Sequence, residues 1–171
     1  IKGGRTVHEY WPKFKSVAVN VSIDGLHDTY EYIRGNGKFA DVEYNIKEMK
    51  KIPSVSRIVG AFTVQANNIL QIDKVIDYFL KDMEIVFYSH RVNYPRALSA
   101  QVLPEKLKQA VVVKLEAMKD KVKDYPIIQK HPVLEKITLR QIQDNINFLQ
   151  AKDLHHYWDD CVDSVSYTHL T

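Results

Sequence analysis

The feature that most constrains the fold is an alternation of apolar strand patterns with helical ones in the first part of the chain. Residues 15–24 (KSVAVNVSID) alternate apolar and polar side chains before a glycine, which is typical of a half-buried strand. Residues 57–65 (RIVGAFTVQ) are apolar almost throughout, as expected of a parallel strand covered by helices on both faces. Residues 84–88 (EIVFY) predict a third strand.

Helical periodicity fills the intervals between these strands. Residues 39–52 repeat apolar side chains at helical spacing, and Pro53 ends the pattern. Residues 67–80 carry one apolar stripe, which Asn67 and Asn68 are placed to cap. Such a β-α-β-α-β order strongly favours right-handed crossovers and a parallel sheet. The sequence therefore predicts an α/β fold, either barrel-like or doubly wound.

Beyond Pro104 the strand patterns end and helical patterns follow, at residues 104–125 and 134–149, with a third beginning near Lys152. We therefore divide the chain into a sheet-containing part, residues 1–103, and a helical C-terminal extension, residues 104–163.

Each end of the sequence leads to a separate prediction. It begins at Ile1 and soon enters the alternating pattern, which predicts further sequence upstream. Residues 164–171 (SVSYTHLT) differ in composition from the stretch before them and are similar to a translated sequencing adapter. We treat them as a non-native tail, the alternative being a natural frayed end.

The composition argues against several classes of partner and metal site. The net charge is only +3, from 24 basic and 21 acidic residues, which gives no electrostatic reason to expect a nucleic-acid partner. Cys161 is the only cysteine, so this chain alone makes no internal disulfide and no four-cysteine zinc or iron–sulfur site. Neither a long apolar run nor a signal-peptide pattern occurs, so we expect no membrane partner and a cytoplasmic location.

Candidate ligand-binding side chains are concentrated in residues 20–37. Ser22, Asp24 and the loop from Gly25 lie at the carboxyl end of the first predicted strand, which is where parallel α/β proteins place their sites. The hydroxyl, the carboxylate and the guanidinium of Arg34 together suit a small zwitterionic ligand.

A structural interpretation of the same residues stays open. Asp24 and Gly25 can form an ordinary turn, and Arg34 can pair with Glu31 or Asp28 on a solvated helix face. Charged pairs of this kind are common on protein surfaces.

The motif SIDG at residues 22–25, followed by YEYIRGNGKFADVEYNI at residues 30–46, resembles the middle of radical S-adenosylmethionine (SAM) enzymes. The similarity continues in FTVQANNI, residues 62–69, which is similar to a strand end and helix cap of that family. It extends to Pro95, Leu98 and the Leu103-Pro104 pair, which resemble a segment of members with a twitch domain. It covers most of residues 5–163.

The resemblance implies an incomplete parallel (β/α) partial TIM barrel, with residues 1–103 as its second half. It implies that Ser22 lies against the aminoacyl or ribose part of SAM and that Arg34 pairs with its methionyl carboxylate. Gln65 and Asn67 would line the same cofactor. The family's reaction generates a 5′-deoxyadenosyl radical with a [4Fe-4S] cluster and a reductant such as flavodoxin or ferredoxin. The substrate, a small molecule or a peptide, and the catalytic residues stay unassigned.

One departure from the family pattern is decisive for activity. The cluster ligands, three cysteines spaced C-x-x-x-C-x-x-C, are absent, and Cys161 is the one cysteine available to an auxiliary cluster. We therefore expect the parent protein to be an enzyme and this fragment alone to be inactive, with no metal ligand among its own residues.

Three other hypotheses compete with this one. A different barrel enzyme, a lyase or hydrolase, would use Asp24 and His27 as acid and base across one loop. A non-catalytic interaction domain would dock a partner through its sheet edge and helices. A metal site would use His155 and Asp159, which are four residues apart on a predicted helix, although a solvated helix face explains them as well.

Overall fold

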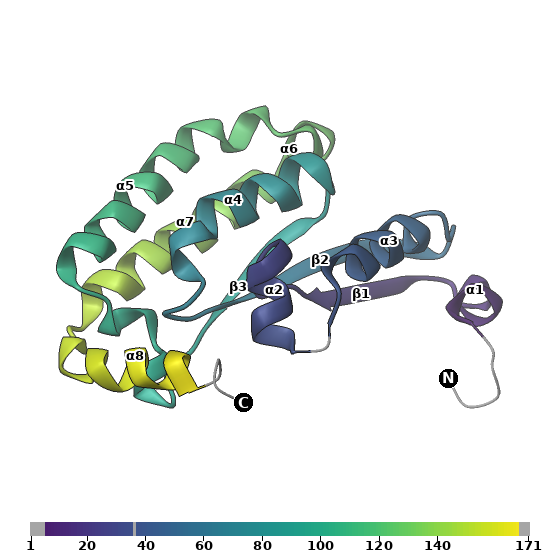
Figure 1. Ribbon diagram of the computed structural model, residues 1–171. Coiled ribbons are helices and arrows are strands. Elements are labelled where there is room, and N and C mark those ends of the chain that lie inside the picture. Colours follow the sequence, from purple (N-terminus) through teal and green to yellow (C-terminus); the bar gives the residue numbers. More distant parts are fainter. Residues whose placement is uncertain (1–5, 36, 168–171) are drawn as a thin grey trace.

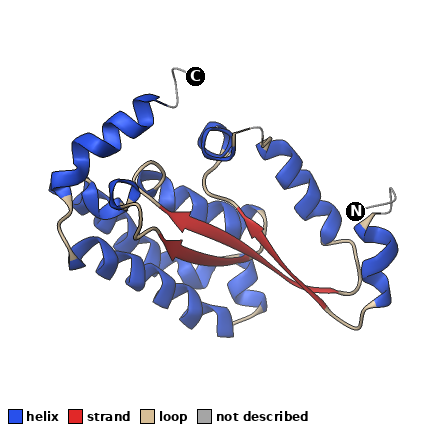
Figure 2. Ribbon diagram, turned by 90° about the horizontal axis from the view of Figure 1, so that it is seen from below, coloured by secondary structure: helices blue, strands red, loops and turns tan. Residues whose placement is uncertain are grey.

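The computed structural model describes residues 6–35 and 37–167. Three strands form one parallel sheet in chain order: β1 (Val17–Ser22), β2 (Val55–Val64) and β3 (Val86–Arg91). Figure 2 shows the three strands pointing the same way. The predicted α/β class and all three predicted strands are therefore confirmed.

Helices connect the strands and continue after them. The α-helices are α1 (Val7–Tyr10), α2 (His27–Arg34), α3 (Phe39–Met49), α4 (Ile72–Asp77), α5 (Glu105–Lys121), α6 (Pro126–Lys130), α7 (Val133–Ala151) and α8 (Trp158–Tyr167). Short 3-10 turns are η1 (Trp11–Lys13), η2 (Ile69–Gln71), η4 (Arg96–Leu98), η5 (Ala100–Val102), η6 (Val122–Asp124) and η7 (His155–Tyr157), and η3 (Tyr78–Asp82) is a π-helical turn that prolongs α4. Figure 1 shows α4, α5 and α7 together beside the sheet.

Helices cover one face of the sheet. In β1, valines that contact the core alternate with exposed Ala18, Asn20 and Ser22. In β2, every second residue from Ile58 to Val64 is buried, while the residues between them are half-buried. The expectation that helices cover both faces of β2 is therefore wrong for the described part of the chain. It failed because small apolar residues on the open face look like core in a sequence. We call the uncovered side the open face.

One buried cluster joins the sheet-containing part to the helical extension. It includes Phe62 of β2, Phe79 of η3, Phe87 of β3, Leu115 of α5 and Ile146 of α7. The aromatic members contact one another, since the ring centroids of Phe79 and Phe87 lie 5.9 Å apart. The helices after residue 104 thus bury the same apolar surface as the crossover helices.

Several boundaries differ from the sequence prediction. β3 begins at Val86 and ends at Arg91, later than predicted, because its polar end does not look like a strand. The last helix begins after η7 and runs to Tyr167, so residues 164–167 continue it. Residues 168–171 of the suspected tail lie outside the described residues. The short helix α6 was not predicted.

The two edges of the sheet differ. At β3, the backbone N–H of Ser89 donates to Oε1 of Gln141 in α7, 2.9 Å away, and the Ser89 hydroxyl donates to the same oxygen. Asn145, also in α7, donates to the Ser89 hydroxyl at 2.8 Å. On its other side, β1 has no strand partner among the described residues.

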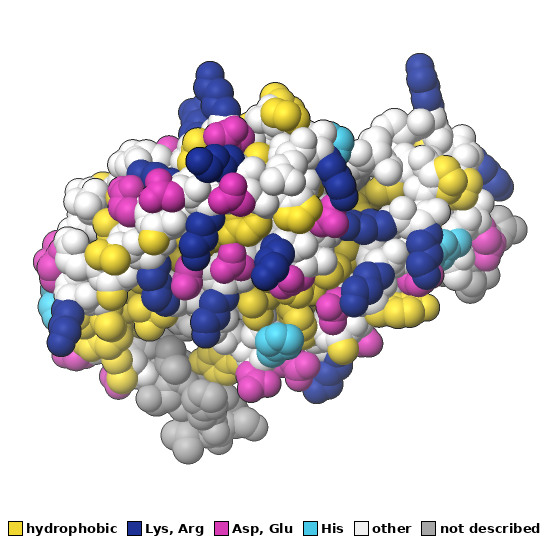
Figure 3. All heavy atoms as spheres, turned by 90° about the horizontal axis from the view of Figure 1, so that it is seen from above, with side chains coloured by type: hydrophobic (Ala, Val, Ile, Leu, Met, Phe, Trp, Pro, Cys, Tyr) yellow, Lys and Arg dark blue, Asp and Glu magenta, His cyan; other side chains and the backbone are white. Residues whose placement is uncertain are grey.

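The surface carries mixed charge. Figure 3 shows lysine and arginine side chains interspersed with acidic ones over one face of the molecule. Within residues 6–35 and 37–167, no helix has both the length and the apolar composition that a bilayer crossing requires.

Candidate functional site at the carboxyl end of the sheet

A buried carboxylate connects three elements at the end of β1. Asp24 is 5% exposed, and its Oδ2 lies 2.6 Å from Nη2 of Arg34 at the end of α2. Its Oδ1 accepts a hydrogen bond of 3.0 Å from the backbone N–H of Thr63, near the end of β2. Both oxygens are therefore engaged, and Asp24 does more than form a turn.

Arg34 has a different partner from either one considered in the sequence. It pairs with Asp24, whereas Glu31 pairs with Lys38 at 2.9 Å and accepts from the backbone of Phe39. The Lys38 hydrogen bond, followed by that of Phe39, lowers the pKa of Glu31. The Arg34 side chain is still 38% exposed, so its guanidinium is held at one side by Asp24 and open to solvent at the other.

The neighbouring loop is organised by Asn68, which is fully buried. Its Nδ2 donates to the backbone carbonyls of Asp24 at 2.9 Å and Thr63 at 2.8 Å. Its Oδ1 accepts from the backbone N–H of Gln65 at 2.9 Å. The sequence predicted a helix cap here, but the Asn68 side chain makes no cap hydrogen bond and instead fixes the loop between β2 and η2 to the end of β1.

Gln65 and Asn67, two predicted cofactor contacts, lie in this fixed loop. Gln65 is half-buried and its backbone is held by Asn68. The Oδ1 atom of Asn67 is buried and has no hydrogen-bond partner among the described residues. Buried acceptors are nearly always satisfied in native proteins, and this oxygen has the capacity to accept from a donor outside the described chain.

Ser22, the remaining predicted contact, is exposed at the end of β1 on the open face. The register places it level with Ala61 of β2, which is level with Tyr88 of β3. The next residue along this face of β3 is His90, whose ring centroid lies 4.8 Å from that of Tyr88. The sequence did not predict Tyr88 and His90 as site residues, and their position beside Ser22 on the open face depends on the strand register.

The alternative acid–base pair is not assembled. Asp24 binds Arg34 and Thr63, while the ring of His27 lies edge-on against Phe39, with centroids 4.8 Å apart. His27 has a φ of 47°, an uncommon backbone conformation outside glycine.

The histidine considered as a metal ligand has other contacts. Nδ1 of His155 lies 3.2 Å from the carbonyl of Val102, and its ring stacks with that of Trp158. Within the described residues, no group of three or more His, Cys, Asp or Glu side chains is placed to hold a metal ion. Cys161 is buried, which raises the pKa of its thiol.

Comparisons with known proteins add no relatives. No family model matches the chain, and no match was found among curated proteins or solved structures. The functional assignment therefore depends on the residues and the geometry described above.

Proposed function

We propose that this chain is part of the partial barrel of a radical SAM enzyme and holds SAM at the carboxyl end of its sheet. The topology supports this, because strands in chain order with helices on one face are the arrangement from which a barrel is built. The observation that carries the proposal is the Asp24–Arg34 pair, which fixes a half-exposed guanidinium beside the ends of two strands.

The donors and acceptors at this edge fit the polar groups of SAM. Arg34 would bind the methionyl carboxylate, because its planar fork of donors matches two carboxylate oxygens. The buried Oδ1 of Asn67 would accept a hydrogen bond from an N–H or ammonium group, which would supply the partner that this oxygen lacks. Ser22 would contact the aminoacyl or ribose part from the open face, and Gln65 would line the loop side.

The [4Fe-4S] cluster does not fit the residues present. A site with three cysteine ligands needs three thiolates, and this sequence has only Cys161, which is buried on α8. The cluster therefore needs cysteines from outside this sequence, and by itself the chain is a cofactor-binding part rather than an active enzyme. In such enzymes SAM supplies a carbon radical for hydrogen abstraction.

The remaining parts of the proposal concern the parent protein. Its substrate would be a small molecule or a peptide facing the open side of the sheet. Its electrons would come from a reductant of the flavodoxin or ferredoxin type. A cytoplasmic location suits this chemistry, because thiols stay reduced there.

Calorimetric titration of the chain with SAM tests the proposal. We expect Arg34→Ala to weaken SAM binding by about 1.5–3 kcal/mol, the usual loss for a charged hydrogen-bond partner. Lys38→Ala is the matched control, because it removes a nearby cation that pairs with Glu31 and leaves the Asp24–Arg34 pair in place. Unchanged SAM affinity in a folded Arg34→Ala variant, or an equal loss in Lys38→Ala, would contradict the assignment.

A further inference from the structure

A cavity lies at the amino-terminal end of the sheet, opposite the site proposed for SAM. It has a volume of about 360 Å³, within the range of small-molecule sites. It is bounded by the starts of β2 and β3, the end of α3, and the turn between α6 and α7. Most of its walls are aliphatic, formed by Val55, Ile58, Ile85, Val86, Ile127 and Leu134.

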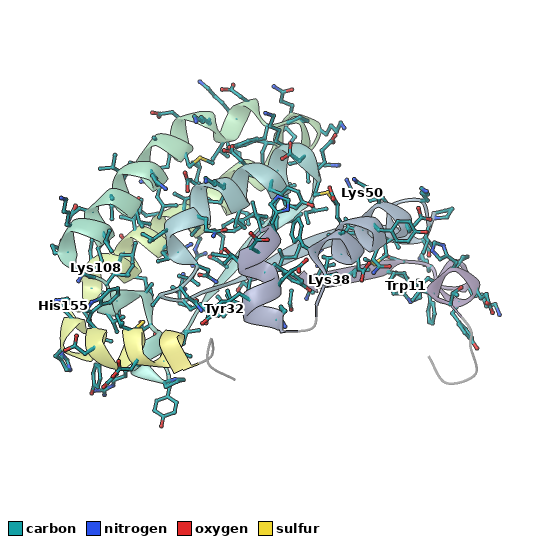
Figure 4. The ribbon with its side chains drawn as sticks, viewed as in Figure 1. Trp11, Tyr32, Lys38, Lys50, Lys108 and His155 are labelled. Carbon is teal, nitrogen blue, oxygen red and sulfur yellow. The ribbon has the colours of Figure 1, made fainter. Side chains whose placement is uncertain are left out.

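The polar residues of this cavity are mainly cationic. Lys130 pairs with Glu84, the one carboxylate in the lining. The ammonium of Lys50 donates to the carbonyl of Met83. Figure 4 labels Lys50 just beyond the end of α3. Arg57 also lines the cavity, and its guanidinium makes no hydrogen bond or ion pair within the described part of the chain. The cavity therefore combines an apolar body with an unneutralised guanidinium.

The local backbone is unusual on one side of the cavity. Glu84 has a φ of 42°, which costs energy for a residue with a side chain, and it follows the π-helical turn η3. Such features occur more often at binding sites than elsewhere. Burial lowers the pKa of Lys50, the nearby Lys130 lowers it further, and Glu84 opposes them.

We propose that this cavity binds a small organic carboxylate with an apolar body. Arg57 would take the carboxylate in a two-pronged contact, and the apolar body would pack against Val55, Val86 and Leu134, which line the cavity and are only partly buried. The site is independent of the proposed SAM site, because it lies at the other end of the strands.

Hexanoate is the probe for this site. Its binding is monitored in solution through the chemical shifts of the backbone amides. We expect saturable shifts at the starts of β2 and β3, with weaker binding of acetate, which lacks the apolar body, and of hexanamide, which lacks the charge. Arg57→Gln should weaken hexanoate binding about tenfold or more. Glu84→Gln should tighten it, because the only competing carboxylate disappears and Lys130 is released.

Lys47→Gln is the matched control, since Lys47 is an exposed lysine of α3 paired with Glu43 and outside the cavity lining. Equal binding of hexanoate and hexanamide, or loss of affinity in Glu84→Gln, would overturn the proposal. A Kd for hexanoate that is unchanged by saturating SAM separates this test from that of the proposed function.

Discussion

Asn67 and Asn68 are adjacent in sequence but have opposite roles in the loop after β2. Asn68 is fully buried and binds three backbone groups through both atoms of its amide. The carbonyl oxygen of Asn67 is buried without a partner in the described chain. One side chain therefore holds the loop, and the other has hydrogen-bonding capacity left for a ligand.

This difference predicts unequal effects on stability. Asn68→Ala removes three hydrogen bonds and leaves their buried backbone partners unsatisfied, so we expect it to lower the free energy of unfolding by about 2–4 kcal/mol. Asn67→Ala removes an acceptor with no partner, so we expect little loss. Urea denaturation of the two variants measures the difference, and equal costs would show that Asn68 does not organise the loop.

The sequence predicted where individual site residues lie better than it predicted which residues they contact. Ser22 and Asp24 were expected at the carboxyl end of the first strand, because a strand pattern that stops at a glycine marks where the strand ends. The pairing of Arg34 with Asp24 was not predicted, because it depends on how α2 folds back over the strand end. Helical spacing pointed to Glu31 or Asp28, which are local neighbours only.

Among the elements, β2 and η3 pack unusually closely. A Cβ atom on Gly60 would come within 2.4 Å of Cε2 in the ring of Phe79, which is completely buried. The glycine in the middle of β2 therefore makes room for an aromatic ring of the crossover helix.

We expect Gly60→Ala to lower the free energy of unfolding by about 1–3 kcal/mol, the usual cost of overpacking a core. Phe79→Leu should relieve part of this clash, so the double variant should be more stable than the sum of the single effects predicts, by more than about 0.5 kcal/mol. Thermal or urea denaturation of all four proteins completes the cycle. Additive effects would mean that the two side chains do not compete for the same space.

Elements with strong periodicity were predicted and short ones were not. The strand at 57–65 and the helix at 134–149 coincide closely with β2 and α7, because long apolar patterns depend little on neighbours. The helix α6 has only five residues and begins at Pro126, which suggested a break rather than a start. The open face was missed because Val59 and Ala61 are apolar without being fully buried.

In the whole molecule, a buried lysine connects the start of α5 to the chain after α7. Lys108 is 4% exposed, and its ammonium lies 3.2 Å from Asp153 and 3.3 Å from Glu105 (Figure 4). The backbone N–H of His155, and then Lys108, lower the pKa of Asp153. Gln109, and then Lys108, lower the pKa of Glu105.

Because both carboxyl groups titrate at lower pH in the folded state, their contribution is complete above their usual pKa range and is lost on acidification. We expect the melting temperature to fall between pH 6 and pH 3 and to fall less in Lys108→Met, which lacks these pairs. Calorimetric scans across this range measure the two slopes. Parallel slopes would show that the pairs contribute nothing to acid stability.

The unequal edges of the sheet limit how copies of this chain can associate. Unpaired strand edges are where separate chains add to one another. Within the described residues, α7 engages the β3 edge at Ser89, and the outer edge of β1 has no strand partner. A second copy that pairs with the β1 edge uses its own β1 edge at the same time. Strand pairing through the described part of the chain therefore ends at two molecules, and barrel strands preceding β1 would occupy this same edge.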